Sequence, residues 1–174
     1  MILDLTELEL GKHHNLTPAM GVSLSHAAAV CINDRGHALN VSSIGKGAYT
    51  RNYTLKRCEV TNEISRTWND MQEATEEGAC GVALVQVAKE SKYQVIERSK
   101  KGTGIDYWLG DKDGFLFQRK ARLEVSGSLN GDEKELNKRL QTKIEQTKQS
   151  DATKLPAIIV IVGFSHPMIL TAER

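Results

Sequence analysis

The 174-residue chain has little cysteine, little net charge and no long apolar run. Its three cysteines, Cys31, Cys58 and Cys80, lie far apart and include no CxxC pair, which favours reduced core thiols in a cytoplasmic protein over disulfides. A formal net charge of +1 gives no bulk argument for nucleic-acid binding, although a local basic patch stays open. The longest apolar run, residues 157–164, is too short to cross a membrane, and the N-terminus lacks the regions of a signal peptide.

What the chain does contain is typical of one globular domain. Hydrophobic residues make up 40% and charged residues 26%, so a core can form without disulfides or structural metal ions. We expect an α+β or α/β fold: a mixed central sheet flanked by helices, with residues 1–60 as an N-terminal helix and hairpin extension of a core at 61–174.

The extension is expected to hold one helix and one hairpin. Ser23 is the expected N-cap of a helix whose apolar residues recur with helical spacing, and Gly36 is its expected end. Residues 38–48 and 49–60 read as two strands joined by a turn. The adjacent His13 and His14 do not share a face of a helix or strand, which favours a surface loop over a metal site.

The core is expected to alternate helices and strands. A helix should run over 61–78 from the capping residue Thr61, followed by strands at 79–87, 93–99, in GTGIDYWLG (102–110) and, after a DKDG turn, at 115–127. An amphipathic helix over 131–151 and a buried strand, AIIVIVGF (157–164), should follow, with the C-terminal tail as an edge segment.

Two acidic residues stand inside apolar, strand-like runs. Asp106 lies between Ile105 and Tyr107, and Glu124 lies between Leu123 and Val125. An isolated buried charge is costly, and strand side chains alternate faces, so neighbouring strands could bring both carboxylates to one spot. That spot would suit a hard divalent cation; the alternative is two ordinary exposed positions or an ion pair such as Glu124 with Arg122.

The order of elements and the two acids resemble the αβββαβ core of the PD-(D/E)xK, restriction-endonuclease-like superfamily, over residues 61–165. The resemblance implies that Asp106 and Glu124 hold Mg²⁺ or Mn²⁺, with Glu76 on the preceding helix as a third ligand. The family has a Lys two residues after the second acid, where this chain has Ser126. Lys120 and Arg122 share the strand face of Glu124 and are the expected substitutes for that Lys.

In that reading the chain is a hydrolase acting on phosphodiester bonds. Metal-bound carboxylates would neutralise phosphate charge, and a Lys or Arg would stabilise the charge that develops. Lys100 and Lys101, in a glycine-bearing loop, and the lysines of the helix at 131–151 could contact a nucleic-acid backbone without reading its sequence.

Two other hypotheses stay open. The chain could be a catalytically inactive module with this fold, acting as a subunit, as a homo-oligomer or as the partner of another protein in a nucleic-acid or defence complex; Ser126 and the near-neutral charge favour this. It could also be a different α+β fold in which the acids are structural ion pairs. Metal binding and nuclease assays on the parent and on Asp106→Ala discriminate among the three.

Overall fold

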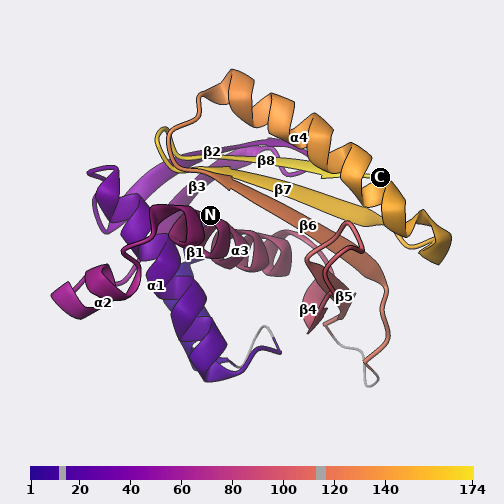
Figure 1. Cartoon of the computed structure of the whole chain (residues 1–174), viewed down its shortest axis with the longest axis horizontal. Coiled ribbons are helices and arrows are strands. Elements are labelled where there is room, and N and C mark those ends of the chain that lie inside the picture. Colours follow the sequence, from indigo (N-terminus) through magenta and orange to yellow (C-terminus); the bar gives the residue numbers. More distant parts are fainter. Residues whose placement is uncertain (12–14, 113–116) are drawn as a thin grey trace.

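The computed structural model describes residues 1–11, 15–112 and 117–174. They form an α/β protein with one mixed eight-stranded sheet and helices on both faces (Figure 1). The strands are β1 (Ile2–Asp4), β2 (Asn40–Gly47), β3 (Arg51–Lys56), β4 (Tyr93–Arg98), β5 (Tyr107–Asp111), β6 (Ala121–Ser128), β7 (Ala157–Gly163) and β8 (Met168–Glu173). The helices are α1 (Pro18–Asp34), α2 (Asn62–Thr67), α3 (Met71–Glu90) and α4 (Glu133–Thr147), with short 3-10 helices η1 (Leu5–Leu10) and η2 (Lys148–Thr153).

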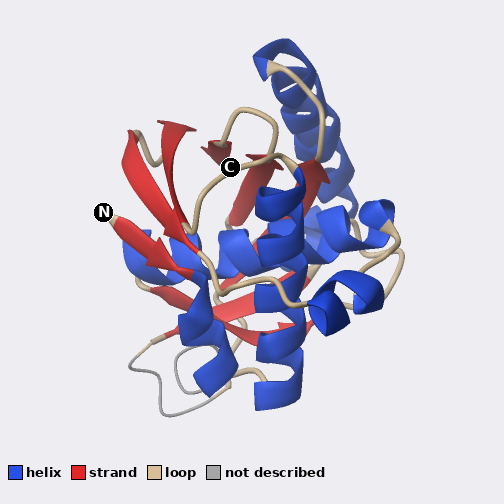
Figure 2. Cartoon of the chain, turned by 90° about the vertical axis from the view of Figure 1, so that its left-hand side faces the viewer, coloured by secondary structure: helices blue, strands red, loops and turns tan. Residues whose placement is uncertain are grey.

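All eight strands belong to a single sheet in the order β1-β3-β2-β8-β7-β6-β5-β4. The pairs β1–β3, β2–β8 and β6–β7 are parallel, and the remaining neighbours are antiparallel. The predicted N-terminal hairpin is confirmed as β2 and β3, and it continues the sheet of the core. Seen at right angles to the first view, the strands twist between the helices (Figure 2).

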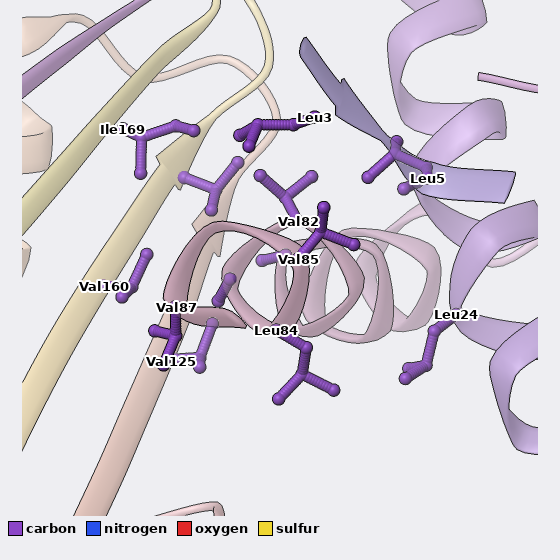
Figure 3. Close-up of a cluster of buried hydrophobic side chains, with 14 of the residues drawn as sticks. Leu3, Leu5, Leu24, Val82, Leu84, Val85, Val87, Val125, Val160 and Ile169 are labelled. Atoms are coloured by element: carbon purple, nitrogen blue, oxygen red, sulfur yellow. The ribbon is translucent and has the colours of Figure 1, made fainter. Parts of the chain in front are cut away.

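Alternating side chains divide the core between the two faces of the sheet. In β7, Ile158 and Val160 belong to the larger cluster, under α1 and α3, whereas Ile159 and Ile161 belong to the smaller cluster, under α4. β7 is buried along its whole length, as its continuous apolar sequence predicted. Figure 3 shows side chains of α3, among them Val82, within the larger cluster.

The predicted strand at 79–87 is wrong, because these residues form the second half of α3. The apolar run fits a buried helix as well as a buried strand, since a helix enclosed on most sides loses its amphipathic period. Gly78, the predicted helix end, lies inside α3 where that helix meets α1: a Cβ there would stand 2.9 Å from the Cα of Ala28. The glycine therefore allows close helix packing instead of ending the helix.

Several predicted boundaries also change. Thr61 does cap a helix, but that helix ends at Thr67, and α3 starts anew behind the capping side chain of Asp70. The helix predicted from Ser23 begins earlier, at Pro18, with Thr17 as its N-cap. The C-terminal tail is not an edge segment: β8 lies inside the sheet between β2 and β7.

Some predictions fall partly or wholly outside the described residues. They are the loop at His13 and His14, the end of the DKDG turn and the start of the strand predicted from 115. Among the described residues, no helix combines the length and the apolar character that a membrane span needs.

Candidate functional site

Asp106 and Glu124 lie opposite each other at the end of the β5–β6 pair. The antiparallel register pairs Tyr107 with Leu123, so the next pair outward is Asp106 with Glu124. The backbone N–H of Asp106 donates to the carbonyl of Leu123 at 2.9 Å, and the N–H of Val125 donates to Asp106 Oδ2 at 2.8 Å. The structure therefore brings together the two acids that the sequence singled out.

Glu124 is the most enclosed acid of this site, with 1% of its surface exposed. Its Oε1 accepts hydrogen bonds from Lys143 Nζ at 2.6 Å and from Gln146 Nε2 at 2.9 Å, both on α4. Its Oε2 is buried and accepts no hydrogen bond from the described residues. A buried carboxylate oxygen that accepts no hydrogen bond is free to coordinate a cation or to bind a proton.

The electrostatics favour a proton or a cation between the two acids. Burial raises the pKa of Glu124 to about 7, and the charge of Asp106 adds to the rise, while Lys143 opposes it. Burial likewise raises the pKa of Asp106, against the hydrogen bond from the Val125 N–H and the charge of Lys143. Near neutral pH, part of the Glu124 population is therefore protonated and can share a hydrogen bond with Asp106.

Lys143 is the residue of the candidate site that the sequence alone does not single out. The sequence predicts nucleic-acid backbone contacts for the lysines of α4, yet the Lys143 side chain is only 24% exposed and reaches the buried carboxylate of Glu124. A signal was present: Lys143 lies three residues after Leu140, on the apolar stripe that faces the sheet. A Lys on this stripe should point its ammonium group toward a buried acceptor.

The predicted substitutes for the family Lys lie elsewhere. Arg122 is buried on the face of Glu124, but its guanidinium donates to Thr147 O at 3.2 Å, Ser150 Oγ at 2.9 Å and Asp151 Oδ1 at 3.1 Å. It ties β6 to η2, and the ion pair considered between Glu124 and Arg122 is replaced by Glu124 with Lys143. Lys120 is exposed just before β6.

Ser126 lies two residues beyond Glu124 on β6 and borders two adjoining cavities. One, of about 280 Å³, lies along α4 and is lined by Lys138, Arg139 and Lys143 among others. The other, of about 460 Å³, lies between the start of α3 and the end of β6. Three positive side chains thus border the smaller cavity together with Glu135, which pairs with Arg139 at 3.1 Å. Lys143 links this cavity to Glu124, and the excess of positive charge suits an anionic ligand.

The helical acid chosen from the sequence, Glu76, is exposed and lines the larger cavity together with Ser126. Its carboxylate accepts a hydrogen bond from Gln72 at 3.3 Å. The neighbouring Glu77 pairs with Arg98 at 3.0 Å. Burial raises the pKa of Cys80, and the charges of Asp106 and Glu77 add to the rise. Glu77 is therefore the α3 carboxylate that shares a neighbour with Asp106.

Comparison of the chain with protein-family models, curated proteins and solved structures found no match.

Proposed function

We propose that this protein is a metal-dependent nuclease in which Asp106 and Glu124 hold Mg²⁺ or Mn²⁺ and Lys143 replaces the Lys missing at Ser126. The observation that carries the proposal is the contact of Lys143 Nζ with Glu124 Oε1 at 2.6 Å, beside Asp106. Two acids on neighbouring strands and one ammonium group are the functional groups that the PD-(D/E)xK resemblance requires. Here the ammonium group comes from α4 instead of β6.

The donor set fits a hard divalent cation. Carboxylate oxygens are the ligands that Mg²⁺ prefers, and Glu124 Oε2 lacks a hydrogen-bond donor among the described residues. A bound Mg²⁺ or Mn²⁺ would supply neutralisation of phosphate charge and a water of lowered pKa. Glu76, in the adjoining cavity, would act through water.

The remaining groups bind and orient the substrate. Lys143 is placed to stabilise negative charge on a phosphate at the mouth of the site. Lys138 and Arg139, one turn earlier on α4, would contact neighbouring phosphates. The exposed Lys100 and Lys101 would add backbone contacts from the loop between β4 and β5.

The burial of Glu124 supports a second candidate function. Lys143 and Gln146 already satisfy one oxygen of a carboxylate that is 1% exposed, so the pair could be a structural remnant in a catalytically inactive nuclease-fold module. Such a module would act as a subunit or binding partner in a nucleic-acid or defence complex. The two functions differ in one measurable property, which is cleavage in the presence of metal.

Calorimetric titration of Mg²⁺ and Mn²⁺ and a nuclease assay on the same samples test the proposal. The substrates are supercoiled plasmid, single-stranded DNA and single-stranded RNA. We expect Asp106→Ala to lose both metal binding and cleavage, and Lys143→Ala to lose cleavage while keeping most metal binding. Asp111→Ala, at the other end of β5, is the matched control and should keep both.

Each outcome distinguishes between the nuclease, the inactive module and a structural ion-pair network. Cleavage that depends on Asp106 and Lys143 supports the nuclease. Metal binding without cleavage of any substrate supports the inactive module. A folded parent that binds neither ion at millimolar concentration contradicts the metal site altogether, and the acids would then be a structural ion-pair network with Lys143.

A further inference from the structure

Glutamate, histidine and cysteine side chains meet at a second place, formed by residues of the first third of the chain. Glu9 at the end of η1, His26 on α1 and Cys58 after β3 each offer one ligand atom, and these atoms lie within 4.8 Å of one another. All three residues are half-buried, so an ion could reach them. Among the described residues, no other group of three such side chains comes this close.

The fold fixes the positions of Glu9 and His26. η1 packs directly on α1, because Gly21 has no side chain: a Cβ there would stand 1.9 Å from the carbonyl oxygen of Leu8. Glu9 is further held by Ser25 Oγ, which donates to its Oε1 at 2.8 Å. The carboxylate is thereby oriented by the residue next to His26.

Cys58 is placed by the residue before it. Arg57 is buried, and its guanidinium donates to Cys58 O at 3.0 Å, to Asn33 Oδ1 at 2.9 Å and to His37 O at 3.1 Å. These bonds fasten the segment after β3 to the end of α1 and the loop that follows. Three separate elements are therefore held around one point before any ligand binds, which lowers the entropic cost of binding.

The chemistry of the three donors selects the kind of ion. A thiolate and an imidazole are soft and borderline ligands that favour Zn²⁺ over Mg²⁺ or Ca²⁺, and a carboxylate is a common third ligand. In a tetrahedral zinc site with bonds of about 2.0 to 2.3 Å, ligand atoms stand roughly 3.3 to 3.8 Å apart. The spacing within this cluster requires only a small contraction to reach that geometry.

A thiol beside an imidazole and a carboxylate is also the arrangement of a nucleophilic cysteine. In that arrangement the carboxylate orients the imidazole, whereas here the Glu9 carboxylate accepts a hydrogen bond from Ser25 Oγ at 2.8 Å. A divalent cation would replace the thiol proton and compensate the charges of the thiolate and the carboxylate. Three ligand atoms around one point therefore suit a metal site better than a nucleophile.

We propose that Glu9, His26 and Cys58 bind one Zn²⁺ ion, with water as the fourth ligand. The ion joins η1, α1 and the segment after β3, and it is independent of the carboxyl pair at Asp106 and Glu124. The site stabilises the N-terminal part of the sheet.

The test uses the full chain, freed of metal by a chelator and titrated with Zn²⁺ against a chromophoric chelator. Co²⁺ serves as a spectroscopic probe, since a thiolate ligand gives a charge-transfer band and tetrahedral coordination gives strong visible bands. We expect one ion per chain, and an affinity at least about tenfold lower in Cys58→Ser and in His26→Gln. Cys80→Ala and His166→Gln are the matched controls, and both should bind as the parent does.

A second measurement needs no variant and so does not depend on a variant's folding. Iodoacetamide labelling of the native parent, mapped by peptide mass, should be several-fold slower at Cys58 when one equivalent of Zn²⁺ is present. Unchanged labelling of Cys58 would overturn the proposal, as would a Co²⁺ spectrum without a thiolate band. Binding that persists equally in folded Cys58→Ser and His26→Gln would place the ion elsewhere and would also overturn it.

Discussion

Replacing Glu124 by Gln isolates the free energy associated with its buried carboxyl group. Gln has nearly the same shape, and its amide oxygen can still accept from Lys143 and Gln146, but it neither ionises nor titrates. The variant therefore removes the unfavourable proximity to the Asp106 charge while keeping most contacts. The difference in stability between parent and variant, followed against pH, reports the titration of Glu124.

The sign and size follow from the raised pKa. The pKa of Glu124 rises from its ordinary value of 4.5 to about 7 in the folded protein, so between these pH values the folded state holds a proton that the unfolded state has released. Stability then falls as pH rises through this window. At about 1.4 kcal/mol for each pH unit, the parent should lose roughly 3 kcal/mol relative to Glu124→Gln between pH 4.5 and pH 8.

The assay is urea unfolding followed by far-ultraviolet circular dichroism, at steps of about one pH unit from pH 4.5 to pH 7.5 and at a final point of about pH 8. Chelator is present throughout, because a bound cation would stabilise the ionised form. Glu73→Gln, at an exposed carboxylate on α3, is the control for the substitution itself. A constant difference between parent and Glu124→Gln across the range would show that Glu124 titrates at an ordinary pH, and would refute the reasoning.

Three further predictions concern the packing around the site. Gly127→Ala should destabilise the protein by about 1 to 3 kcal/mol in urea unfolding, because its Cβ would stand 2.5 Å from the carbonyl oxygen of Thr75 on α3. Leu136→Ala should cost about 2 to 5 kcal/mol in the same assay, since this buried side chain anchors α4 to the sheet. Asp151→Ala should lower the thermal unfolding midpoint, because among the described residues Asp151 is the one carboxylate that pairs with the buried Arg122.

Exposed positions serve as controls for these changes. Leu10→Ala, at a side chain 62% exposed, should cost less than Leu136→Ala by at least about 1 kcal/mol. Glu59→Ala, an exposed acid, should leave the midpoint near that of the parent, unlike Asp151→Ala. Equal effects at core and exposed positions, or an unaltered Gly127→Ala, would contradict the packing described for β6, α3 and α4.

The sequence correctly predicted those elements in which the spacing of apolar residues matches the pattern of buried side chains. The amphipathic stripe of α4, the hairpin of β2 and β3 and the continuous apolar run of β7 all formed near their expected bounds. The run at 79–87 did not, because a helix buried between α1 and the sheet carries the same apolar composition as a buried strand. The small residues of α3 permit its close approach to α1, and their role can be recognised only when the position of α1 is known.

The candidate site, too, could be predicted from the sequence only in part. Two acids in apolar surroundings were visible in the sequence, since a charge there requires a partner. The sequence does not identify their partner, Lys143, because it lies 19 residues beyond Glu124 on α4, which crosses the face of the sheet to which Glu124 points. Arg122 shows the converse: its strand parity was read correctly, but its guanidinium is occupied by η2.

By itself, the sequence determined the mixed α/β character, the buried β7 and the anomaly of Asp106 and Glu124, because these depend on composition and on alternation along one strand. Only the tertiary structure decided that residues 1–60 continue the same sheet, that β8 lies inside it, and that Lys143 completes the carboxyl pair. It also brought Glu9, His26 and Cys58 together from three elements. Such contacts between distant residues depend on how the helices pack on the sheet, and residue spacing in the sequence does not predict that packing.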